Sequence, residues 1–178
     1  MAYLKKNMRR TIVSLHVIFS ALWTGAALSM IVVLFTKTPE NVSGLLAYNH
    51  ANKLIDDWII IGAGTGSFLT GLLLSWKTPW GFFKHWWVTV KLALTLILVM
   101  LGTIWLGKWT NGLVYMVQEQ GIEVYSNRKY LDYQTLLQFW GSLQVGVLIV
   151  IYFISVFKPW KKFKNQMKNR NYEYDNKK

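Results

Sequence analysis

Residues 11–35 read TIVSLHVIFSALWTGAALSMIVVLF and contain no Lys, Arg, Asp or Glu. A helix needs about 20 mainly apolar residues to cross the hydrocarbon core of a membrane. The stretch also lacks the polar stripe that a helix of a soluble bundle presents to water. It therefore predicts a membrane-spanning helix. Because it is longer than the roughly 7–15 apolar residues of a signal peptide, we interpret it as an uncleaved span.

Three further stretches have the same character, and they cover residues 58–76, 85–107 and 136–157. The single charge inside them is Lys91, which is costly at that depth unless it reaches the interface or a partner. Pro79 and Gly81 predict a tight turn between the second and third spans. The sequence thus predicts an all-α, integral membrane four-helix bundle with up-down-up-down order, formed by residues 1–157 and followed by a basic tail, 158–178.

The composition excludes several classes of protein. Of the 178 residues, 53% are hydrophobic and 16% are charged, whereas soluble proteins carry about 25% charged residues. Cys is absent, so neither disulfides nor thiolate metal sites can form. We find no phosphate-cradling glycine motif and no hydrolase or transferase signature. A membrane oxidoreductase is the enzyme class that stays open.

The basic residues are distributed unevenly between the two ends of the bundle. Of the 20 Lys and Arg residues, 14 lie in the N-terminus, the second turn and the tail. By the positive-inside rule this places both termini in the cytoplasm. The net charge of +12 then favours contact of the tail with anionic membrane lipids, at about 1 kcal/mol per basic residue, over contact with nucleic acid.

Four smaller features of the sequence lead to expectations. The connection 36–57 allows a helical extension of the second span, and Asp56 with Asp57 is interpreted as a helix start that complements the helix dipole. The run GAGTGSFLTG at 62–71 predicts a close helix–helix contact. Gln144 is interpreted as an interhelical hydrogen-bond partner. Four residues of the last connection are spaced as one face of a short helix on the membrane surface: Leu113, Met116, Val117 and Gln120.

Two of the three histidines are expected at one depth. His16 lies near the start of the first span and His85 begins the third, and both spans run outward from the cytoplasm. The first and third helices of such a bundle are diagonal across its core. Imidazoles from them could ligate one heme, or a metal, from both sides. Heme propionates would then pair with basic residues at that end, namely Arg9, Arg10, Lys84 and Lys91.

The first span, RRTIVSLHVIFSALWTGAALS with His16, Trp23 and Gly25, resembles the opening helix of small bacterial four-helix membrane proteins of unknown function and of copper-resistance D-type proteins. Its Arg, His and Gly spacing is also similar to that of bacterial b561-type cytochromes b. The latter resemblance implies heme b, quinone-linked electron transfer and a bacterial cell membrane. The chain has only three histidines, and His50 has no evident partner for a second heme. The resemblance therefore implies at most one heme, held by His16 and His85.

Three functional hypotheses remain open at this point. The leading one is a cytochrome-b-like protein that holds one heme b or metal for electron transfer or heme sensing. The second is a non-enzymatic accessory or transport-related bundle that packs through its glycines. The third is copper handling by His50 with Met30, Met100 or Met116. A quinone or redox partner and a homo-oligomer are compatible with each of them.

Overall fold

The structure, a computed structural model, describes residues 4–36, 39–78 and 85–159, and all regular elements in these ranges are helical. Two of the short elements, η1 and η2, are π-helical, and η3 is a 3-10 helix. In chain order the elements are α1 (Lys6–Leu34), α2 (Val42–Leu54), η1 (Ile55–Ile60), α3 (Ile61–Lys77), α4 (Trp86–Leu101), η2 (Gly102–Leu106), α5 (Gly107–Gln120), η3 (Gly121–Ser126) and α6 (Arg128–Phe157).

These elements join into four long helices because α2, η1 and α3 follow one another without a break, as do α4, η2, α5 and η3. Each of the four is long and apolar enough to cross a membrane. Each predicted span falls within one of them to within a residue. The all-helical, four-helix part of the prediction is therefore confirmed.

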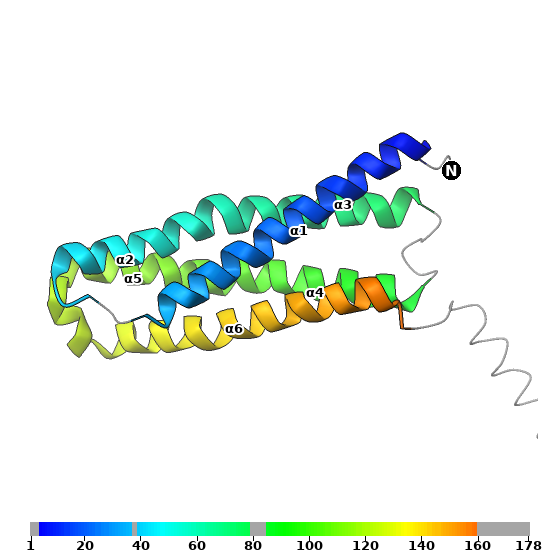
Figure 1. The fold of residues 1–178 in the computed structure, drawn as a ribbon. Coiled ribbons are helices and arrows are strands. Elements are labelled where there is room, and N and C mark those ends of the chain that lie inside the picture. The colour runs from blue at the N-terminus through cyan, green and yellow to red at the C-terminus, as the bar shows by residue number, and fades with distance from the viewer. Residues whose placement is uncertain (1–3, 37–38, 79–84, 160–178) are drawn as a thin grey trace, which may run out of the picture.

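Consecutive long helices run in opposite directions (Figure 1). The start of α1, the end of α3, the start of α4 and the end of α6 share one end of the molecule. At that end the backbone N–H of Leu4 donates to the carbonyl of Lys77 at 3.1 Å. Helices α1 and α4 each pack against both α3 and α6. They are therefore the diagonal pair of the bundle.

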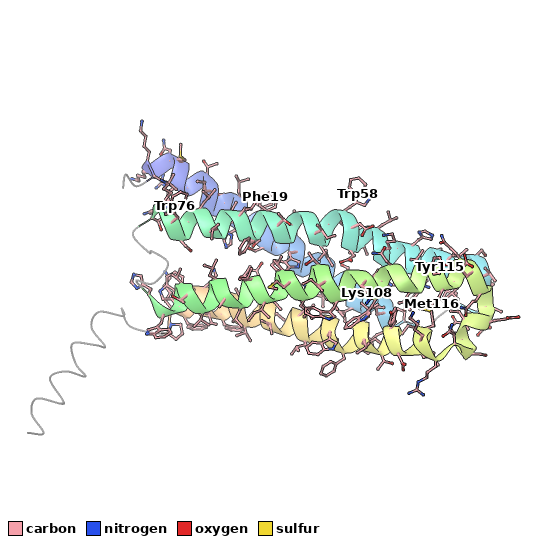
Figure 2. All side chains as sticks on the ribbon, turned by 180° about the vertical axis from the view of Figure 1, so that it is seen from behind. Phe19, Trp58, Trp76, Lys108, Tyr115 and Met116 are labelled. Carbon is pink, nitrogen blue, oxygen red and sulfur yellow. The ribbon has the colours of Figure 1, made fainter. Side chains whose placement is uncertain are left out.

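The outward faces of the helices are apolar. Figure 2 shows Trp58 projecting away from the bundle, and its side chain is 78% exposed. Soluble monomers rarely expose large contiguous apolar surfaces, so this surface suits lipid rather than water. Further exposed apolar side chains include Val17, Leu28, Val32, Leu69, Ile97, Ile149 and Phe153.

Two of the helices are much longer than a membrane is thick. Val42–Lys77 has 36 residues and Trp86–Ser126 has 41. At about 1.5 Å per residue they reach roughly 54 and 62 Å, against about 30 Å for the hydrocarbon core. The excess lies at the end away from the termini, where α2, α5, η3 and the first turns of α6 pack together. We call this part the helical extension.

The buried core of the bundle continues into the helical extension, and two interpretations of the sequence were wrong there. Leu113, Met116 and Val117 are buried inside the protein instead of lying on a membrane surface. Their helix, α5, packs against α2 and α6, so its apolar face is already covered. Asp56 does not start a helix, because the helix begins at Val42 and is capped by Asn41, whose Oδ1 accepts from the Gly44 N–H at 2.7 Å.

The glycine run of α3 packs against α1, as predicted. A methyl group at Gly64 would lie 3.3 Å from the Trp23 ring, and one at Gly66 would lie 2.8 Å from the Phe19 ring. Small residues let two helices approach closely in lipid, where hydrophobic burial supplies no drive. Gly62 differs from these two, since a methyl group there meets nothing within 4 Å.

Replacing Gly66 by alanine is therefore expected to destabilise the bundle by about 1–3 kcal/mol, because the new methyl group overlaps the Phe19 ring. Gly62→Ala is the matched control, and it should be neutral or slightly stabilising because alanine favours the helix. Unfolding in detergent by titration with a denaturing surfactant measures both. Equal stabilities of the two variants would argue against this packing.

Candidate functional site

A cavity of about 250 Å³ lies inside the bundle at the end that holds the start of α1. Its walls come from α1, α3, α4 and the end of α6. Most of the lining is apolar, including Val13, Phe68, Leu74, Trp87 and Leu92. The polar groups that reach it are three serines, one threonine, His16 and the lysines Lys91 and Lys158. Among the described residues, no carboxylate lines it.

His16 is held in one orientation by α3. Its Nδ1 lies 3.0 Å from the carbonyl oxygen of Ser67 and 3.0 Å from the hydroxyl oxygen of Thr70. A carbonyl oxygen only accepts, so Nδ1 carries the hydrogen and the neutral ring keeps its lone pair on Nε2. A backbone carbonyl on one ring nitrogen is the arrangement that usually orients a histidine whose other nitrogen binds a metal.

A serine pair supports this part of α1. Ser20 Oγ donates to the His16 carbonyl at 2.7 Å and lies 2.8 Å from Ser67 Oγ. Because the single hydrogen of Ser20 is used on His16, the Ser67 hydroxyl donates to Ser20. Gly71 allows the close approach of the ring, since a methyl group there would lie 3.1 Å from His16 Cε1. The residue types of α3 therefore fix the position of His16.

Lys91 faces the same cavity from α4, across the bundle from His16. Its side chain is half-buried. Neither of the ion pairs among the described residues includes it; these join Lys53 to Asp57 and Arg128 to Asp132. A cation inside an apolar site without an anion is costly, so the cavity favours a ligand that brings a negative group.

The structure brings together only some of the residues that the sequence predicts for heme binding. His16 and Lys91 line one cavity, whereas His85 is the residue before α4 and is not part of the lining. The ring of His85 lies 6.2 Å from that of Trp87. Arg9 and Arg10 are exposed in the first turns of α1. Lys84 lies outside the described residues.

The residues expected for copper handling lie apart from the His16 cavity. Met30 and Met116 are buried, in α1 and α5, whereas Met100 and His50 are exposed. No group of three His, Asp or Glu residues that could hold a metal ion occurs among the residues that the structure describes. A heme differs from a bare ion in this respect, because the porphyrin supplies four of the donor atoms itself.

A second polar group inside the bundle was missed from the sequence. Asp56 is 4% exposed and lies in the π-helical η1, near Gln144 of α6. The sequence predicts that Gln144 forms a hydrogen bond between helices. Its Oε1 is buried, but it has no hydrogen-bond partner among the described residues. The one available signal was the spacing of Tyr48, Asn52 and Asp56 at every fourth residue, which puts three polar side chains on one helix face.

No protein-family model, curated protein or solved structure matches this chain. The class of protein is therefore defined by its own fold and site. Over the described residues it is an all-helical bundle with four helices able to span a membrane, and it encloses a largely apolar cavity lined by one oriented histidine and two lysines, neither of them in an ion pair with a described residue.

Proposed function

We propose that this chain is a membrane protein that binds one heme b in the His16 cavity, where His16 would hold the iron through Nε2 and Lys91 would pair with a propionate. The observation that carries the proposal is the presence of an oriented imidazole and an uncompensated cation in one apolar cavity. Heme uses both features, since it combines an iron centre, an apolar ring and carboxylates. When bound, it supplies one-electron chemistry for electron transfer or a coordination site for heme sensing.

The cavity restricts how such a cofactor binds. Its volume of about 250 Å³ is slightly below the roughly 300–1,000 Å³ of typical ligand sites, so a macrocycle in it extends past the rim. The residues available for ligation also differ from the bis-histidine arrangement. His16 is the one histidine in the lining among described residues, which favours a single protein ligand to the iron.

The membrane arrangement belongs to the same proposal. Four helices able to span a membrane support a multi-pass membrane protein. The resemblance of the first span to bacterial membrane proteins is what supports a bacterial cell membrane. The basic residues at the end with the His16 cavity support a cytoplasmic location for that end and for both termini. The helical extension then projects outside. A quinone or a protein redox partner would approach the cavity from the inner leaflet, and the tail 158–178 would contact anionic lipids.

Titration of the purified protein with hemin tests the proposal. We expect a sharp Soret band that saturates at one heme per chain. Lys91→Met should bind about 10-fold more weakly, because it removes a charged partner of a propionate. Lys108→Met, at an exposed position of α5, is the matched control. A protein that stays colourless with excess hemin would exclude the heme, and the non-enzymatic accessory or transport-related bundle and copper handling would then be the remaining interpretations.

A further inference from the structure

A second set of polar groups is buried in the half of the bundle next to the helical extension. The buried side-chain atoms without a hydrogen-bond partner among the described residues are Trp23 Nε1, Tyr48 Oη, Asn52 Oδ1 and Gln144 Oε1. A polar atom buried without a partner costs about 1–3 kcal/mol, so proteins rarely leave several together. Tyr48 and Asn52 share the helix face of Asp56, and Trp23 and Gln144 line one small cavity together with Asp56. Their grouping indicates a site for a small polar ligand such as water.

Two small cavities lie at Asp56 and Gln144. One, of about 30 Å³, lies between these residues and Met30, Leu106 and Gly141. The other, of about 20 Å³, is lined by Asp56, Gln144 and Trp23. A water molecule needs about 10–15 Å³ and two to four polar partners. Each cavity therefore has room for one water, and the second also has a donor in Trp23 Nε1 and an acceptor in Gln144 Oε1.

Among the described residues, no ion pair joins Asp56 to a positive charge. The charged groups near it, Lys53 and Asp57, lie on its own helix, and Lys53 Nζ bonds Asp57 Oδ2 at 2.6 Å. The side chains that face Asp56 across the two cavities from α1, α4, η2 and α6 are uncharged. On the side of α5, Gly107 lies next to the carboxyl group, with Asp56 Oδ2 3.5 Å from the position of a methyl group there. These surroundings stabilise a neutral carboxyl group, which donates a hydrogen bond that an ionised one cannot.

We propose that Asp56 is an internal proton-binding site, whose carboxyl group exchanges a proton with the helical-extension side through waters shared with Gln144 and Trp23. Uptake forms one O–H bond on the carboxylate with a proton from water, and release reverses it. The protonated group supplies the missing donor to Gln144 Oε1, directly or through a water. Asn52 and Tyr48 continue the polar face of the helix from Asp56 toward the extension.

The backbone around Asp56 suits such a site. Asp56 lies in the π-helical η1, and Gly102, which lines both small cavities, begins the π-helical η2. π-Helical turns interrupt the regular hydrogen-bond ladder and are frequent at functional sites. Asp56 and Gly71, which contacts His16, are fifteen residues apart on one continuous helix, or roughly 22 Å. The proton site is thus separate from the His16 cavity and does not depend on the heme proposal.

Infrared difference spectroscopy on the full chain in lipid vesicles tests the inference. On a change of pH we expect the C=O stretch of a buried protonated carboxyl group to appear, and to be absent in Asp56→Asn. Asp132→Asn removes an exposed carboxylate and should leave the band unchanged. Gln144→Leu should keep the band but shift it, because the carboxyl group loses its partner. Such a shift would not follow from a merely structural role.

A second measurement uses no variant of Asp56. The measurement is carbon-13 NMR of wild-type protein labelled at the aspartate carboxyl carbons. During a pH titration, the signal of one carboxyl carbon should change in a pH range well apart from that of the exposed aspartates. A carboxyl signal that stays ionised throughout the accessible pH range, or an infrared band that survives in Asp56→Asn, would overturn the proposal. So would a titration that sodium ions suppress, since that result would identify a metal-cation site instead.

Discussion

Replacing His16 by alanine is expected to weaken hemin binding by more than about 100-fold, because it removes the axial nitrogen, whereas loss of a residue that only orients a ligand costs 10- to 100-fold. His16 is the histidine that lines the cavity, and Ser67 and Thr70 fix its ring. The Soret band of the purified variant, recorded during a hemin titration, measures the change.

The other two histidines are matched controls for this experiment. His50 is exposed on α2, and His85 precedes α4 outside the cavity lining. His50→Ala and His85→Ala are therefore expected to keep the Soret band. Loss of the band in His85→Ala as well would restore the bis-histidine arrangement that the sequence predicts. Retention of the band in His16→Ala would instead show that the heme binds elsewhere.

Rescue by a free ligand separates ligation from folding. The variant His16→Gly leaves space where the ring was, so added imidazole is expected to restore the Soret band if His16 acts as an axial ligand. A variant that is misfolded would not respond to imidazole. Circular dichroism of the same samples reports whether the helices are intact.

The level of His16 along the bundle could be predicted from the sequence, but the residues that line the cavity with it could not. Rise along the helix placed His16 near the level of the start of α4, and the residues of α4 that line the cavity do lie opposite it. On α4 that face is formed by Val88, Lys91 and Thr95, at helical spacing. His85 would continue this face if the helix began earlier. The helix begins at Trp86, however, and His85 has an extended backbone.

The position of Asp56 depended on a feature that hydrophobic periodicity does not reveal. The sequence shows an acidic pair before an apolar run, which is typical of a helix start. The structure instead continues the helix upstream to Val42 and inserts a π-helical turn at Asp56. A π turn changes which residues face inward, so that Asp56 is buried and Asp57 remains half-exposed. The partners on α1 and α6 come from distant parts of the chain.

The apolar face of α5 was recognised correctly, but its partner was not. The spacing of Leu113, Met116 and Val117 predicts an amphipathic helix whether the covering surface is lipid or protein. The choice depends on α2 and the start of α6, which pack against α5 in the helical extension. The helical extension is therefore a tertiary feature, and its stability depends on the residues that join the three helices.

Tyr130 of α6 contacts both α2 and η3, and Tyr130→Ala is expected to cost about 3–5 kcal/mol, as large-to-small changes of buried aromatic residues do. Its side chain is 0% exposed, and its hydroxyl oxygen accepts from Asn49 Nδ2 at 3.3 Å and from Gln134 Nε2 at 3.2 Å. Its ring meets that of Tyr125 edge to face, with centroids 6.0 Å apart.

Amide hydrogen exchange shows which helices lose stability in Tyr130→Ala. In Tyr130→Ala the amides of α2, α5 and η3 should exchange roughly 100- to several-thousand-fold faster, whereas those of α1 and α3 near His16 should change little, because the extension opens as a separate unit. Tyr130→Phe isolates the hydroxyl group and should cost about 1–3 kcal/mol, because it removes the acceptor of one N–H of the buried Asn49 and one of the half-buried Gln134. Tyr115→Ala, at a side chain that is 63% exposed on α5, is the matched control. Uniformly faster exchange along all four long helices would instead show that the extension and the membrane-spanning part unfold together.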